Sequence, residues 1–338
     1  MVVPRTLFTP GILVLWCLSL PGTAESQSQD RCRAPFQVGF QVIDIPGGPK
    51  TAIWYPTSAR EQTYPYSKEL AGSVAKDGPP VKCGRFPLIV FSHGLAGCGI
   101  QSVFFTEQLP RAGYVVMAPD HRDALCSSAG GGAPLRIQRP EDSLLEPQKW
   151  TASSYADRRT DLEAVINWAL QSREFGGMID REHIGGVGHS LGGYALLGLA
   201  GGWPSWKDPR IKALLLFSPY VNPFLVDNRL KSIDVPLMYQ GAQLDIGITP
   251  FLRGSQGAYA ARKEGNYYVE LRGGNHFEWT NALCFGQKRV QDCLARKPNA
   301  RLIVLYGAAF LDSNLKGDSG GIRRLRGEGL ATMERGGH

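Results

Sequence analysis

Apolar residues along most of the chain follow two alternating patterns. Short runs rich in Val, Ile and Tyr alternate with segments of helical periodicity, which is typical of a mostly parallel sheet with helices on both faces. Eight strands are predicted, at 36–43, 51–55, 86–92, 114–119, 183–188, 211–217, 236–241 and 267–271. Helices are predicted at about 102–112, 156–172, 191–200 and 300–311. The pattern therefore predicts an α/β fold with an eight-stranded sheet.

Two segments depart from this rhythm. The turn-rich residues 44–49 separate the first two strands, which favours an antiparallel hairpin at a sheet edge. Residues 123–150 are irregular, contain three prolines and leave the carboxyl end of a predicted strand. Open α/β sheets bind ligands at that edge, so this long connection is a candidate for substrate contact.

The chain contains the sequence Gly188-His189-Ser190-Leu191-Gly192 between the predicted strand 183–188 and the predicted helix 191–200. A G-x-S-x-G motif in this context is typical of a nucleophile elbow, in which a sharp turn exposes the serine hydroxyl. The chain has 41 glycines, so the motif alone could arise by chance. His189 is expected to point away from the nucleophile.

Asp245 and His276 follow Ser190 in the order Ser, Asp, His, and each lies beyond the end of a predicted strand. This order is that of α/β-hydrolase triads, in which histidine is the base and the acid orients it. The alternatives are an ordinary loop acid for Asp245 and a surface histidine for His276. Asp227 and Asp234 are competing acids, but neither closes a strand.

The tetrahedral intermediate of acyl transfer needs two hydrogen-bond donors for its oxyanion. The amide of Leu191, directly after the nucleophile, is the first candidate. The second is the amide of Leu95, because His93-Gly94-Leu95 follows the third predicted strand. The alternative is that this segment is only a turn that ends the strand.

Residues 1–24 are predicted to be a signal peptide. They contain Arg5, an apolar stretch at 11–20 and small residues before a cut after Ala24. That stretch is shorter than the roughly 20 residues that a membrane span needs, although an uncleaved anchor is the alternative. Residues 25–316 are then predicted to form one α/β-hydrolase domain, with a peripheral tail at 317–338.

The charge pattern favours no nucleic-acid partner. The formal net charge is +7, and no block of consecutive Lys and Arg exceeds two residues. The cysteines form no C-x-x-C pair and the histidines do not cluster with them, so neither a metal site nor a cofactor is predicted.

Six cysteines follow the predicted signal peptide, which favours disulfides in an exported chain. Cys98 and Cys126 follow strands that should be neighbours, and Cys284 and Cys293 lie nine residues apart. The preferred connectivity is therefore Cys98–Cys126, Cys284–Cys293 and Cys32–Cys83.

The segments Phe86–Leu95, Tyr114–Asp123 and Gly188–Gly193, with those around Asp245 and His276, resemble the dienelactone hydrolase and platelet-activating factor acetylhydrolase branch of α/β-hydrolases. The similarity extends from about residue 36 to 316. It implies a metal-free serine esterase in which Ser190, Asp245 and His276 form the triad and Leu95 and Leu191 the oxyanion hole.

Two features depart from this resemblance. Animal acetylhydrolases place the acid after the strand that follows the elbow, whereas here Ser218-Pro219 follows that strand. Dienelactone hydrolases use a cysteine nucleophile where this chain has Ser190. Bacterial polyester and lipid esterases of similar design are equally plausible relatives.

The sequence thus predicts a secreted or periplasmic carboxylic-ester hydrolase that acts through an acyl-enzyme on short-chain acyl, lipid or polyester-like esters. A peptidase or amidase with the same triad is the alternative among enzymes. A non-catalytic binding protein of hydrolase fold is the alternative outside enzymes. The acyl-chain length, the alcohol moiety and the oligomeric state do not follow from these residues.

Overall fold

The computed structural model describes Met1 and residues 34–130, 143–261, 265–327 and 331–335. The predicted signal peptide after Met1, Cys32 and part of the 123–150 connection therefore lie outside the described residues. In the part that is described, no helix is both long enough and apolar enough to cross a bilayer.

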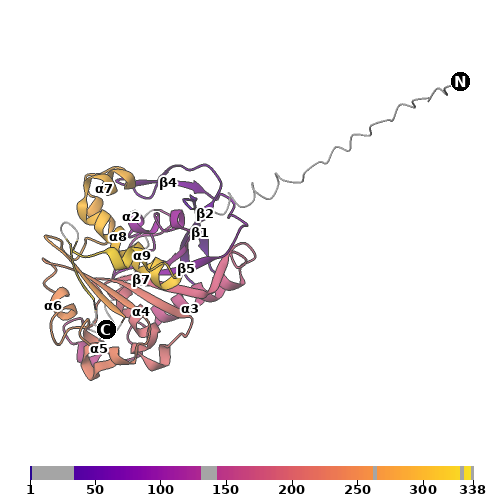
Figure 1. Ribbon diagram of the computed structural model, residues 1–338. Coiled ribbons are helices and arrows are strands. Elements are labelled where there is room, and N and C mark those ends of the chain that lie inside the picture. The colour runs from indigo at the N-terminus through magenta and orange to yellow at the C-terminus, as the bar shows by residue number, and fades with distance from the viewer. Residues whose placement is uncertain (2–33, 131–142, 262–264, 328–330, 336–338) are drawn as a thin grey trace.

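A single mixed sheet runs through the molecule (Figure 1). Its spatial order is β11-β10-β9-β8-β7-β5-β6-β2-β1-β4-β3. The strands are β1 (Gln37–Asp44), β2 (Lys50–Thr57), β3 (Gln62–Pro65), β4 (Ala71–Lys76), β5 (Phe86–Ser92), β6 (Val115–Pro119), β7 (Ile179–His189), β8 (Ile211–Phe217), β9 (Leu237–Ala242), β10 (Asn266–Leu271) and β11 (Ala331–Arg335). The neighbours from β6 through β5, β7, β8 and β9 to β10 are all parallel.

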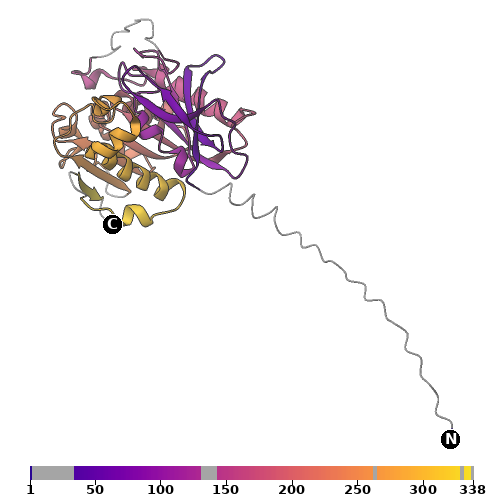
Figure 2. The ribbon, with the colours of Figure 1, turned by 90° about the horizontal axis from the view of Figure 1, so that it is seen from above.

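The α/β fold is confirmed, but the predicted number of eight strands is wrong because the sheet has 11. The hairpin of β1 and β2 is present and antiparallel, as predicted. The three additional strands all lie toward the edges: β4 and β3 beyond β1, and β11 antiparallel to β10. Residues 331–335, predicted to lie in a peripheral tail, thus extend the sheet at the edge opposite the N-terminal strands (Figure 2).

Helices cover both faces of the sheet, and each face has its own apolar core. One core includes side chains of α3 and α4, and the other includes side chains of α2, α7 and α8. The helices are α2 (Val103–Thr106), α3 (Ala156–Gln171), α4 (Leu191–Leu197), α5 (Asn222–Leu225), α6 (Thr249–Leu252), α7 (Val290–Arg296), α8 (Pro298–Leu315) and α9 (Gly320–Arg324). Along β5 the side chains alternate between the cores, with Leu88 and Val90 in one and Ile89 and Phe91 in the other.

The predicted helix at 102–112 is not continuous. It is divided into the short α2 and the single 3₁₀ turn η1 (Pro110–Ala112). Pro110 has no backbone N–H to donate and its ring obstructs the preceding helical turn, so a new turn begins there. The predicted helices at 156–172 and 300–311 correspond to α3 and α8.

The disulfides Cys98–Cys126 and Cys284–Cys293 are present, as predicted. The first ties the loop after β5 to the loop after β6, and the second joins the segment after β10 to α7. The third predicted pair includes Cys32, which is outside the described residues, so Cys32–Cys83 stays a prediction.

Glu107 is a fully buried carboxyl group directly after α2. Its Oε1 accepts a hydrogen bond from the amide of Ser73, 3.2 Å away in β4. The positive charge of Arg111 acts on Glu107, but the guanidinium makes two hydrogen bonds to the carboxylate of Glu61. Burial raises the pKa of Glu107 to about 7, since water can no longer solvate the ionised form.

We predict that Glu107 makes the fold more stable in mild acid. Because its pKa is higher in the folded than in the unfolded chain, its contribution is fully present below about pH 4.5 and is lost as the pH rises through 7. Denaturant unfolding at pH 4.5 and 7.5 should show that the wild type loses about 2–3 kcal/mol more over this interval than Glu107→Gln, which cannot ionise. Parallel pH profiles for the two proteins would contradict this prediction.

Candidate active site

Ser190 lies in the sharp turn between β7 and α4 and has a positive φ of 51°. This conformation is strained for a residue with a side chain, and it raises the hydroxyl above the carboxyl edge of the sheet. The two motif glycines make the turn possible. A Cβ at Gly192 would collide with the backbone of Ser92 in β5, and one at Gly188 would lie 2.7 Å from the backbone of Gly192.

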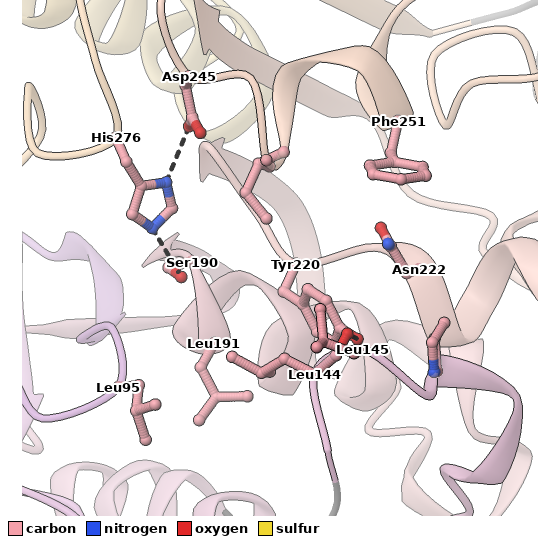
Figure 3. A pocket seen from close by; sticks show the side chains of 13 residues that line it. Leu95, Leu144, Leu145, Ser190, Leu191, Tyr220, Asn222, Asp245, Phe251 and His276 are labelled. Atoms are coloured by element: carbon pink, nitrogen blue, oxygen red, sulfur yellow. Dashed lines mark hydrogen bonds and ion pairs between the residues drawn. The ribbon is translucent and has the colours of Figure 1, made fainter.

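The three residues predicted as a triad lie together (Figure 3). His276 Nε2 is 3.0 Å from Ser190 Oγ, and His276 Nδ1 is 2.8 Å from Asp245 Oδ2. Asp245 follows β9 and His276 follows β10, and both strands run parallel to β7, so the two residues reach the same edge of the sheet as Ser190. The backbone N–H of Leu244 also donates to the carbonyl oxygen of Gly274 at 2.8 Å. This hydrogen bond joins the loop that carries Asp245 to the loop that carries His276.

Asp245 is buried and ionised. Its side chain is only 4% exposed, and burial by itself would raise the pKa of the carboxyl group. Hydrogen bonds from His276 and Ser218 outweigh this effect, so the pKa lies below the ordinary value. The carboxylate can therefore fix the Nδ1–H tautomer of His276 and stabilise a positive charge on its ring.

Ser218 is a site residue that the sequence analysis missed. It directly follows β8 and has a positive φ of 40°. Its hydroxyl donates to Asp245 Oδ2 and lies 3.1 Å from His276 Nδ1. Ser218 thus lies directly after the strand that follows the elbow, where animal acetylhydrolases place their acid. In the sequence, this position stood out only because it carries no acid.

His189 points away from Ser190, as expected. Each of its ring nitrogens lies within hydrogen-bonding distance of a partner. Nδ1 lies 3.2 Å from the side-chain amide nitrogen of Gln101, and Nε2 lies 2.9 Å from the carbonyl oxygen of His276. Gln101 Oε1 in turn accepts from the amide of Gly94 at 3.0 Å. Burial and the neighbouring His276 lower the pKa of His189 to about 3, so it is neutral. These hydrogen bonds link the loop after β5, the end of β7 and the loop after β10.

Leu95 and Leu191, whose amides are the predicted oxyanion donors, lie at the same site. Both residues line the pocket that contains Ser190 and His276. Among the described residues, neither amide N–H donates a turn, loop or cap hydrogen bond. Leu95 and Leu191 therefore stay the predicted oxyanion donors.

The pocket above Ser190 has a volume of about 520 Å³ and mainly apolar walls. Leu144 and Leu145 come from the 123–150 connection, and Leu145 is 91% exposed. Tyr220 follows β8, and its hydroxyl donates to the carbonyl of Leu144 at 2.7 Å. Figure 3 shows Phe251 on the far side of the pocket from Leu95. The described end of the long connection thus forms one wall, as its position in the sequence suggested.

The competing acids lie elsewhere. Asp227 and Asp234 are exposed and form ion pairs with Arg229 and Lys207. Neither is among the residues that line the pocket.

Two comparisons with known proteins bear on this site. Residues 65–150 match the family model described as platelet-activating factor acetylhydrolase, isoform II. The platelet-activating factor acetylhydrolase of Cavia porcellus is 25% identical in an alignment of 202 residues that covers 51% of this chain and 44% of that protein. The chain therefore spans less than half the length of this curated relative. The resemblance to the platelet-activating factor acetylhydrolase branch of serine α/β-hydrolases is confirmed.

We predict that Asp245→Asn lowers kcat for ester hydrolysis by about 10⁴, because the amide would favour the wrong tautomer of His276. Asp227→Asn is the matched control and should keep kcat within twofold, since Asp227 is exposed and pairs with Arg229 away from the pocket. Steady-state kinetics on p-nitrophenyl butyrate measure both. If Asp227→Asn lowered kcat more than Asp245→Asn did, Asp245 would not be the acid that orients His276.

Ser218→Ala should have a smaller effect. It removes one hydrogen bond to the Asp245 carboxylate and leaves the His276 contact in place. A loss of about tenfold in kcat is expected, because a hydrogen bond to a charged group contributes about 1.5 kcal/mol. A loss as large as that of Asp245→Asn would contradict this expectation and would mean that Ser218 is as important as Asp245 for the orientation of His276.

Proposed function

We propose that this protein is a carboxylic-ester hydrolase that uses Ser190 as the nucleophile. The observation that carries the proposal is the continuous hydrogen-bonded series from Ser190 Oγ through the His276 ring to Asp245 at the floor of an apolar pocket. The similarity to platelet-activating factor acetylhydrolases supports an ester substrate.

In the first half of the reaction, His276 Nε2 takes the proton of Ser190 Oγ while the oxygen attacks the ester carbonyl. The amides of Leu95 and Leu191 donate to the oxyanion of the tetrahedral intermediate, and each such donor is worth roughly 3 to 4 kcal/mol. His276 then donates this proton to the leaving alcohol. The acyl group remains bound to Ser190 as an ester.

In the second half, water enters and His276 Nε2 takes its proton. The resulting hydroxide attacks the ester on Ser190, and collapse of the second intermediate releases the carboxylic acid. Ser190 regains its proton from His276. The nucleophile, the base and the oxyanion donors all come from this chain, so the proposed reaction requires no cofactor.

The pocket walls indicate the substrate class. Leu95, Leu144, Ile248 and Phe251 offer apolar surface, and Tyr220, Asp245 and His276 are the ionisable residues among the described lining residues. With no Lys or Arg among those lining residues, the groups next to the scissile bond should be uncharged. Esters with short acyl chains, including lipid and polyester-like esters, fit this description.

We also propose that the protein acts outside the cytosol. The disulfides Cys98–Cys126 and Cys284–Cys293 support an oxidising compartment, because such bonds rarely persist in reducing ones.

Ser190→Ala tests the proposal. The variant should fold with an unchanged melting temperature and lose activity on p-nitrophenyl esters by a factor on the order of 10⁶, since no other group can form the acyl-enzyme. Ser153→Ala, which changes an exposed serine, is the control and should keep full activity. A Ser190→Ala protein with a tenth of the wild-type rate would refute the assignment.

The same assay, run over acyl chains of increasing length and on a p-nitroanilide, defines the substrate. The apolar pocket predicts turnover of the esters and little or none of the anilide. Anilide hydrolysis at a comparable rate would identify an amidase instead.

A further inference from the structure

We propose that Arg158 is a positioning residue that orients the Leu95 amide for the oxyanion. The inference rests on the proposed ester hydrolysis and concerns the oxyanion loop, defined here as residues 93–96. Arg158 does not line the pocket and would act only through this loop.

Arg158 lies in the first turn of α3, and its side chain is completely buried. Its Nη1 donates to the carbonyl oxygen of His93 at 2.6 Å. Its Nη2 donates to the carbonyl oxygen of Gly94 at 3.3 Å. One guanidinium thus holds two consecutive carbonyl groups of the oxyanion loop.

The Gly94 carbonyl and the Leu95 N–H belong to the same peptide unit. In a planar trans peptide the C=O and N–H bonds point in opposite directions. His93 Nδ1 also lies 2.6 Å from the Gly94 oxygen, so this carbonyl has two partners on the inner side of the loop. With its carbonyl held inward, the peptide unit must present the Leu95 N–H outward, toward the pocket that Leu95 lines. Hydrogen bonds to a carbonyl also polarise the N–H of the same amide and strengthen it as a donor.

Asp123 holds Arg158 in this position. Its Oδ1 and Oδ2 accept from Arg158 Nη2 at 2.9 and 2.7 Å. Oδ2 also accepts from the amide of Ala96 at 3.2 Å, so the pair holds both ends of the oxyanion loop. Burial alone would raise the pKa of Asp123, but the charge of Arg158 lowers it well below the ordinary value, so the carboxylate stays ionised.

A purely structural role accounts poorly for this pair. Apolar side chains of similar volume can often replace a buried ion pair without loss of stability, because desolvation offsets the attraction between the charges. A guanidinium, in contrast, can direct several N–H groups at fixed angles toward a carboxylate and two carbonyls. The hydrogen bonds of Arg158 and Asp123 therefore favour a role in orienting the oxyanion loop.

The double variant Arg158→Met/Asp123→Leu tests the proposal, since it removes the charges and keeps similar volume. We expect kcat on p-nitrophenyl butyrate to fall about 10- to 100-fold with KM within threefold of the wild type, because a misplaced oxyanion donor weakens transition-state binding. The Ki of a trifluoromethyl ketone, whose tetrahedral adduct places an oxyanion in this site, should rise by a similar factor. The Ki of the corresponding amide, a ground-state analogue, should not change.

Arg159→Ala is the matched control. Arg159 is the next residue of α3, but it is partly exposed and pairs with Glu163. This variant should keep wild-type kcat and inhibitor affinities.

Two results with the double variant would overturn the proposal. The first is wild-type kcat and ketone affinity, which would leave Arg158 with a structural role only. The second is an equal loss of affinity for the ketone and the amide, which would indicate a collapsed pocket.

If the double variant does not fold, Arg158→Lys decides the question. Lysine keeps a charge beside Asp123 but cannot reach both carbonyls, so kcat should still fall at least tenfold with KM little changed. A wild-type kcat in Arg158→Lys would overturn the proposal. Failure of the underlying ester hydrolysis would be visible separately, as a wild-type protein without turnover and without inhibition by the ketone.

Discussion

The close packing of α4 against the end of β5 is the constraint on which the site depends. A Cβ at Gly192 would overlap the backbone of Ser92, so the helix can approach β5 only at a glycine. This approach places Ser190 in its positive-φ turn and brings the amide of Leu191 next to the loop that carries Leu95. The nucleophile and the Leu191 amide are therefore positioned by backbone packing.

The same edge of the sheet collects the other polar groups. β8, β9 and β10 run parallel to β7, so Ser218, Asp245 and His276 all emerge beside Ser190. Two further sets of hydrogen bonds connect their loops. The Gln101 and His189 side chains link the loop after β5 to His276. The buried Arg158–Asp123 pair also holds that same loop. Each group of the site is thus held by bonds to a neighbouring loop.

The sequence was informative where function depends on local order along the chain. The elbow motif between a strand and a helix, and a strand end before Asp245 and His276, indicated which residues would meet because parallel strands share an edge. It was less informative where structure depends on distant partners. β3 and β11 are short, largely exposed edge strands that form only against β4 and β10. Ser218 and Arg158 look like ordinary residues until the groups to which they donate are known.

Trapping the acyl-enzyme tests the central claim, that Ser190 forms a covalent intermediate. The protein is mixed with p-nitrophenyl butyrate, quenched in acid within milliseconds and digested, and the acylated peptide is identified by mass spectrometry. A butyryl group on Ser190, formed as fast as the first equivalent of p-nitrophenol is released, is the predicted result. A butyryl group on another residue that forms and decays at the rate of turnover, with Ser190 unmodified, would contradict it.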